Sequence, residues 1–170
     1  LAPGTTPRKI LLKSWEGVYF DINQQGMDQM MADIASMGGE LFVMDDGWFG
    51  DKYPRKNDSS SLGDWVVDKN KLPNGIEGLL SDAKKHGVKF GIWIEPEMAN
   101  TTSELYEKHP DWVLKASERD VVLGRGGTQV VLDLANPAVQ DFVFGVVDNL
   151  MTSYPEIDYI KWDANMSVQN

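Results

Sequence analysis

Short β-rich runs alternate regularly with helical segments along this 170-residue chain. Parallel strands need a crossover connection, usually a helix, so this order is typical of an α/β fold with a parallel sheet. We expect strands at residues 10–15 (extending toward Phe20), 41–44, 88–94, 130–133 and 157–163. We expect helices around residues 27–34, 76–86, 103–108 and 137–150.

The pattern favours a TIM-type barrel over a doubly wound sheet. A dinucleotide-binding sheet carries a glycine-rich turn after its first strand, whereas Gly124, Gly126 and Gly127 precede a strand. A complete (β/α)8 barrel has eight strands and about 250 residues. We therefore expect residues 1–170 to form one domain, the N-terminal part of such a barrel with about five of its strands. The start at Leu1, with neither an initiator methionine nor a signal-peptide pattern, suggests a domain excised from a longer multidomain chain.

Composition excludes several classes of function. The chain has 16 Lys plus Arg against 26 Asp plus Glu, a formal net charge of -10, and a nucleic-acid-binding protein needs the opposite sign. It has no cysteine, which excludes disulfides, thiolate metal sites and cysteine nucleophiles. No apolar run approaches the length of a membrane span. We predict no membrane partner and no cofactor, and no targeting signal assigns a compartment.

Acidic residues follow four of the predicted strands. Such residues are depleted in strands and are costly in a barrel mouth unless they are paired. Active sites of barrels form at the carboxyl ends of the strands. The pattern predicts an active site at this edge of the sheet without choosing a reaction. The residues concerned are Asp45, Asp46, Glu95, Glu97, Asp133 and Asp163.

Side-chain alternation on the last predicted strand places Lys161 and Asp163 on one face and Ile160 and Trp162 on the other. If the apolar pair packs on the helices, the lysine and the aspartate point into the mouth together. A neighbouring ammonium lowers the pKa of a carboxyl, which keeps Asp163 ionised and able to act as a nucleophile. A structural ion pair that only anchors the strand is the alternative.

Tryptophans accompany the acidic residues. On the strand at 88–94, Trp93 shares a face with the carboxylates that follow it. Indole faces suit the C–H faces of sugars, and carboxylates accept strong hydrogen bonds from hydroxyls, so a carbohydrate site is favoured. The polar segment 51–71 is longer than an ordinary connection between two elements, and we expect it to contribute residues to the site. The tryptophans interpreted as core residues are Trp65, Trp112 and Trp162.

Six sequence strings carry more specific information. They are Ser14-Trp15-Glu16, Phe42-Val43-Met44-Asp45-Asp46-Gly47-Trp48-Phe49-Gly50, Leu62-Gly63-Asp64-Trp65, Trp93-Ile94-Glu95-Pro96-Glu97-Met98, His109-Pro110-Asp111-Trp112-Val113 and Lys161-Trp162-Asp163. In this order, between about Lys13 and Asn165, the chain resembles the bacterial α-galactosidases of glycoside hydrolase family thirty-six.

The resemblance implies a retaining hydrolase that removes terminal α-linked galactose through a covalent glycosyl-enzyme intermediate. It implies Asp163, the aspartate of the Lys-Trp-Asp string, as the nucleophile. We expect α-galactoside oligosaccharides of the raffinose and melibiose type as substrates, a homo-oligomeric full-length protein, and no metal. The galactose pocket implied by the resemblance contains Trp15, Asp45, Asp46, Trp93, Arg125, Lys161 and Asn165.

The chain departs from the family pattern in two places. The family motif continues Asp-Met-Asn-Arg, whereas Ala164 and Met166 flank Asn165 here. A Gly-Gly-Thr sequence follows Arg125, the residue matched to the family's arginine. The family's acid/base aspartate belongs to the next barrel strand, beyond Asn170, so this chain alone is expected to show no turnover.

Three alternatives stay open at this point. Acidic groups on successive barrel strands can bind Mg²⁺, as in a metal-dependent lyase or isomerase. The chain could instead be a catalytically inactive sugar-binding module. Within the sugar-active class, these residues do not separate a hydrolase from a galactosyl transferase or an N-acetylgalactosaminidase.

Overall fold

The computed structural model describes residues 7–168, so the features noted at residues 1–6 lie outside it. The strands are β1 (Leu11–Lys13), β2 (Leu41–Met44), β3 (Lys89–Ile94), β4 (Met98–Asn100), β5 (Gln129–Val131) and β6 (Ile157–Trp162). The helices are α1 (Trp15–Val18), α2 (Gln24–Ser36), α3 (Gly75–His86), α4 (Glu104–Lys108), the 3-10 helix η1 (Pro110–Trp112) and α5 (Pro137–Ser153).

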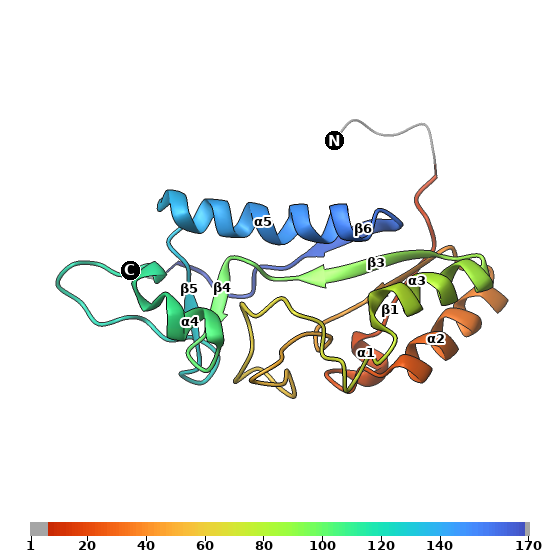
Figure 1. Ribbon diagram of the computed structural model, residues 1–170, viewed down its shortest axis with the longest axis horizontal. Coiled ribbons are helices and arrows are strands. Elements are labelled where there is room, and N and C mark those ends of the chain that lie inside the picture. Colours follow the sequence, from red (N-terminus) through yellow and green to blue (C-terminus); the bar gives the residue numbers. More distant parts are fainter. Residues whose placement is uncertain (1–6, 169–170) are drawn as a thin grey trace.

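Four strands form a parallel sheet in the order β1-β2-β3-β6. Helices α2, α3 and α5 lie between successive strands of this sheet in the sequence. Figure 1 shows α5 running alongside β3 and β6, with α2 and α3 grouped near β1. Because each crossover contains a helix, the strands run parallel and their carboxyl ends meet at one edge. The predicted α/β fold class is confirmed.

The strand predicted at residues 130–133 belongs to a different sheet from the one expected. It forms β5, which pairs antiparallel with β4 in a separate two-stranded ribbon, with Ala99 opposite Val130. Figure 1 shows this ribbon beyond the carboxyl end of β3. In the described residues the parallel sheet therefore has four strands instead of five, and β6 is the fourth. A short β-branched run looks the same in either sheet, because its composition does not specify its partner.

This change of sheet removes Asp133 from the barrel edge. Its amide donates to the Trp112 carbonyl (2.7 Å), and its Oδ1 accepts from the Ala135 amide (3.0 Å). Asp133 therefore closes a turn ahead of α5. The first strand is also shorter than predicted, because it ends at Lys13 and Trp15 begins α1.

Two helix ends carry residues that are typical of helix termini. The Asn136 side chain accepts from the Ala138 amide (3.0 Å), with Pro137 at the first position of α5. Gly87 follows α3 in the left-handed conformation, with φ 72°. These contacts satisfy backbone groups that a helix terminus leaves unpaired.

The core lies between the helices and the parallel sheet. Met27, Met31 and Ile34 of α2 are buried, as their spacing predicts. They join one cluster with strand residues that include Phe42, Met44, Phe90, Ile92 and Ile94. Within residues 7–168, no helix is long and apolar enough to cross a membrane.

Candidate active site

The candidate site is built where the parallel strands end. Asp45 follows β2, Glu95 follows β3 and Asp163 follows β6. After β1, Ser14 Oγ accepts from the Asp45 amide (2.9 Å). The Asp163 amide donates to the Ile94 carbonyl (2.8 Å), which continues the ladder between β3 and β6. These contacts hold the polar side chains at one edge of the sheet.

Lys161 lies between two carboxylates of the site. Its Nζ is 2.8 Å from Asp45 Oδ2 and 3.9 Å from Asp163 Oδ2. Lys161 and Asp163 thus lie close together, as the alternation predicts, although the shorter ion pair is with Asp45. Asp45 is 2% exposed, so one ammonium sits beside a buried and a half-buried carboxylate.

Asp163 is surrounded by groups that favour its ionised form. Trp93 Nε1 donates to Asp163 Oδ2 (3.0 Å), and the Ala164 amide donates to Oδ1 (3.2 Å). Partial burial raises the pKa of the Asp163 carboxyl. Hydrogen bonds from Asn165 and Trp93, together with the Lys161 ammonium, outweigh burial and leave the pKa below its ordinary value. An ionised, oriented carboxylate is the form that a nucleophile needs.

Trp93 contacts the site through its N–H, since its ring is buried. The residue is 2% exposed, and its ring stacks on Phe49 with centroids 6.1 Å apart and planes 4° apart. Trp48 Nε1 donates to the Trp93 carbonyl (2.9 Å). In this structure the indole fixes the Asp163 carboxylate and does not present an open face.

Glu95 anchors the backbone that follows Asp163. It is 2% exposed, and its Oε1 accepts from the Asn165 amide (2.6 Å). Burial raises the pKa of the Glu95 carboxyl, and the Asp163 charge adds to that effect, while hydrogen bonds from Asn165 oppose it. Glu95 and Asp163 therefore have pKa values shifted in opposite directions.

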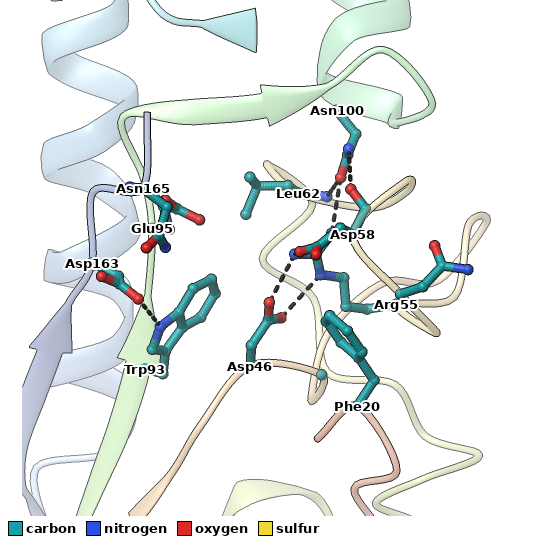
Figure 2. A network of polar contacts seen from close by, with 12 residues as sticks. Phe20, Asp46, Arg55, Asp58, Leu62, Trp93, Glu95, Asn100, Asp163 and Asn165 are labelled. Carbon is teal, nitrogen blue, oxygen red and sulfur yellow. Dashed lines mark hydrogen bonds and ion pairs between the residues drawn. The ribbon is translucent and has the colours of Figure 1, made fainter. Parts of the chain in front are cut away.

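The chain turns at Gly47, directly after the adjacent residues Asp45 and Asp46. Gly47 has φ +116°, and a Cβ there would lie 3.0 Å from the Phe20 Cα and carbonyl oxygen. Asp46 then pairs with Arg55 through two hydrogen bonds, Nε to Oδ1 (2.9 Å) and Nη2 to Oδ2 (2.8 Å), as Figure 2 shows. Burial raises the pKa of the Asp46 carboxyl, and the Arg55 guanidinium opposes this shift.

Arg55 is the main residue that sequence reasoning missed. It is 0% exposed and belongs to the segment 51–71, which was expected to serve the site. Its Nη1 donates to Asn100 Oδ1 (3.0 Å), and its Cζ lies 5.2 Å from the centroid of the Phe20 ring. The available signal was the single arginine of this segment, nine residues after Asp46, since a buried carboxylate needs a cationic partner.

Lys71 joins three backbone segments of the site. Its Nζ donates to the carbonyls of Phe20 (2.8 Å), Gly47 (2.7 Å) and Arg55 (2.7 Å). Burial lowers the pKa of the Lys71 ammonium, and the charge of Asp68 opposes that shift. The lysine thus fixes the turn at Gly47 against the loop that carries Arg55.

The remaining predicted residues lie at the rim. Trp15 is half-buried in α1, with its ring edge-on to Phe20 at a centroid distance of 4.9 Å. Arg125 is exposed with φ 48°, and its Nη1 donates to Asp58 Oδ2 (3.2 Å). Asn165 is also exposed. The strand ends therefore bring together Asp45, Trp93, Lys161 and Asp163.

The candidate site lies apart from the cavity that the apolar walls of the structure enclose. Among residues 7–168, no three His, Cys, Asp or Glu side chains are arranged to hold a metal ion. A cavity of about 860 Å³ lies elsewhere, and none of the predicted site residues lines it. Its apolar walls include Trp65, Trp112 and Phe142. The candidate site therefore lies at the strand ends outside this cavity, with Asp45 and Trp93 buried and Lys161 and Asp163 half-buried.

Fold and constellation together define a class of α/β proteins that carry carboxylates, a lysine and an indole at the carboxyl edge of a parallel sheet. Residues 4–170 match the Melibiase family model, and the chain belongs to this family. It is 46% identical over 171 residues to "Probable alpha-galactosidase C" of Aspergillus flavus, covering 96% of this chain and 22% of the relative. It is 45% identical over 158 residues to "Alpha-galactosidase AgaA" of Geobacillus stearothermophilus, covering 93% of this chain and 21% of the relative.

Solved structures give the same assignment. The α-galactosidase of Lactobacillus brevis superimposes with a TM-score of 0.84 at 42% identity, covering 92% of this chain and 20% of that one. The GH36 α-galactosidase AgaA of G. stearothermophilus superimposes with a TM-score of 0.83 at 44% identity, covering 91% and 21%. The chain therefore spans about a fifth of the length of these proteins, and the resemblance to family thirty-six is confirmed.

Proposed function

We propose that this chain is part of a retaining α-galactosidase in which Asp163 is the nucleophile. The observation that carries the proposal is the environment of Asp163, whose Oδ2 accepts from Trp93 Nε1 at 3.0 Å and lies 3.9 Å from Lys161 Nζ. The lowered pKa of this carboxyl keeps it ionised. The names of the relatives support galactose as the sugar.

In the proposed reaction, an oxygen of Asp163 attacks the anomeric carbon of a terminal α-galactoside. The bond to the leaving oxygen breaks with its electron pair going to that oxygen, which takes a proton from the acid that we propose on the next barrel strand. Water then attacks the β-linked intermediate, its proton passes to the same group, and Asp163 is released. Two inversions retain the configuration of the sugar.

The proposal also assigns the sugar contacts. An ionised carboxylate has about four lone-pair sites, so Asp45 and Asp46 can accept from galactose hydroxyls while they stay bound to Lys161 and Arg55. AgaA variants of G. stearothermophilus were crystallised in complex with stachyose and raffinose, which supports α-galactoside oligosaccharides as substrates. The other proposed sugar contacts are Trp15, Arg125, Lys161 and Asn165. Trp93, predicted as a contact from the sequence, has a buried ring and is proposed to act through the N–H that it donates to Asp163.

We further propose that residues 1–170 form one part of a catalytic barrel within a longer, homo-oligomeric protein. The chain covers 21% to 22% of the length of its curated relatives, which supports this. On this proposal the isolated chain has no turnover, because the proton donor belongs to another part of the barrel. Light scattering on the full-length protein, with an assay of the isolated chain, tests both statements.

The decisive experiment replaces the proposed nucleophile in the full-length protein. Asp163→Gly should reduce hydrolysis of p-nitrophenyl α-galactoside by a factor on the order of 10⁴. Added azide should enter the vacated space and form β-galactosyl azide. Asp158→Gly is the matched control, since Asp158 lies on the same strand but pairs with Lys89 (3.2 Å). Activity of Asp163→Gly close to that of the control would show that another residue is the nucleophile.

A further inference from the structure

Asp58 connects two parts of the site that come from different loops. Its Oδ1 lies 3.5 Å from Arg55 Nη2, and its Oδ2 accepts from Arg125 Nη1 at 3.2 Å. Arg55 in turn binds both oxygens of Asp46. Four charged groups thus alternate in sign along one path, Asp46, Arg55, Asp58 and Arg125, and Figure 2 shows the first three.

Arg55 is a fixed member of this path. A guanidinium has five N–H donors, and here the polar partners around it are enough to engage all of them. Two aromatic rings also lie 5.2 and 5.6 Å from its Cζ, and the side chain is 1% exposed. Because it cannot turn without losing several contacts, it fixes the orientation of the carboxylate that it binds. Its partners are Asp46, Asp58, Ser60 and Asn100, with the rings of Phe20 and Phe49.

Asp58 is anchored through its backbone, which leaves its carboxylate to the two arginines. Its carbonyl accepts from Asn100 Nδ2 (2.8 Å), from Gln129 Nε2 (3.2 Å) and from the Thr128 hydroxyl (3.4 Å). Thr128 and Gln129 follow Arg125 closely in the sequence. The Asp58 side chain is 43% exposed. Replacing its carboxylate therefore removes a charge without removing the contacts that hold the loop.

We propose that Arg55 and Asp58 are positioning residues for galactose. Arg55 orients Asp46, and Asp58 restrains Arg125, so that sugar contacts from two loops are presented together. The inference rests on the proposed function, in which Asp46 and Arg125 bind the sugar. A long exposed arginine loses rotamer freedom when it binds a ligand, and a carboxylate that restrains it beforehand reduces that loss.

Positioning of this kind has a recognisable kinetic signature. It strengthens binding of substrate and transition state alike, so its loss raises KM while kcat stays unchanged. Asp58 and Arg125 form a half-exposed pair, with side chains 43% and 38% exposed. Pairs of this kind have small effects, which corresponds to a rise in KM of about two- to fivefold.

The experiment uses Asp58→Asn in the full-length protein. We expect KM for p-nitrophenyl α-galactoside and the calorimetric Kd for galactose to rise together, with kcat and thermal stability retained. Asp58→Glu should recover part of the affinity because it restores the charge. Asp141→Asn is the matched control, since Asp141 is exposed on α5. A variant that melts earlier but keeps its KM and Kd would show that Asp58 has only a structural role.

A double-mutant cycle tests the link to Arg125. If Asp58 acts on the sugar through Arg125, then Asp58→Asn should raise KM much less in an Arg125→Met background than in the unsubstituted protein. Independent effects that add would overturn the inference.

The unsubstituted protein separates the inference from the proposed function. If it neither hydrolyses the galactoside nor binds galactose, the proposed function fails and the inference fails with it. If it is active and Asp58→Asn leaves KM and Kd unchanged, only the inference fails.

Discussion

Replacing Arg55 by methionine should open the segment 51–71. Methionine is long and flexible enough to stay between the two aromatic rings, so the change removes mainly the charge and the N–H donors. Asp46 would be left buried, since it is 5% exposed, and without the cation 2.8 Å away. Removing one partner of a buried ion pair costs about 3–5 kcal/mol, because the other charge stays buried without compensation. We expect a loss of that size in the free energy of local opening.

Hydrogen–deuterium exchange of the full-length protein measures this opening. The Leu62 amide donates to Asn100 Oδ1 (2.9 Å), the oxygen that also accepts from Arg55 Nη1 (3.0 Å). The Asn100 amide donates to the Leu62 carbonyl (2.9 Å). Both amides should therefore exchange faster in Arg55→Met. An exposed arginine replaced in the same way, Arg119→Met, should leave them protected.

The effect should depend on pH. Burial raises the pKa of the Asp46 carboxyl above its ordinary value of 3.8. The protonated carboxyl therefore stabilises the folded state fully at pH values below 3.8, and this stabilisation is lost as the pH rises through the raised pKa. Without Arg55, whose guanidinium opposes the shift, the pKa rises further. Acidification should then restore stability in Arg55→Met by up to about 1.4 kcal/mol per pH unit. A cost of under about 1 kcal/mol in Arg55→Met, or a further loss of stability when Asp46→Asn is added to Arg55→Met, would show that Asp46 does not depend on this cation.

Two further predictions concern the neighbours of the site. Trp93→Phe removes a hydrogen bond that lowers the pKa of Asp163. The acidic limb of the pH profile of kcat/KM should therefore move to higher pH by as much as about one unit. An acidic limb at the same pH in the variant and the unsubstituted protein would contradict this. Gly47→Ala forces a Cβ to within 3.0 Å of the Phe20 backbone at positive φ and should cost about 3 kcal/mol or more in thermal unfolding. Gly38→Ala, also at positive φ but with open space around it, should cost only about 1–2 kcal/mol, and equal losses in both variants would remove the steric argument.

Sequence patterns predicted best the elements that are buried throughout or that bury one regularly spaced face. The run at residues 41–44 is buried throughout, and it was predicted with its observed bounds. The strand at 89–94 and the helix α5 were also found near their predicted limits, because apolar periodicity and capping residues act locally. The strand at 129–131 was found as an element, but its partner Met98–Asn100 carries little β-signal, so its sheet could not be predicted.

The cationic partner of a buried carboxylate, here Arg55, is harder to predict from sequence than the carboxylate itself. Asp46 stood out because an acidic residue after a strand is unusual, whereas an arginine in a polar loop is not. Its burial depends on contacts made at long range, such as that with Asn100, 45 residues away. Local sequence therefore identified the carboxylate that needs a cation, and only the folded loop identified the cation.

The ion pair of Lys161 with Asp45 required knowledge of strand order. The two residues are 116 positions apart, and β3 lies between the strands that carry them. The register pairs Trp93 with Lys161 and Met44 with Ile92, so Asp45, one residue further along, is level with Trp93.

Gly91 lies two residues before Trp93 on the same face of β3. A Cβ there would come within 3.0 Å of Tyr159 and 3.1 Å of Val43, on the two flanking strands. Gly91 therefore leaves room for side chains of both flanking strands, two residues before the level at which Lys161 pairs with Asp45. Alternation therefore predicts which side chains share one face of a strand, whereas strand order and register explain why Lys161 Nζ lies closer to Asp45 (2.8 Å) than to Asp163 (3.9 Å).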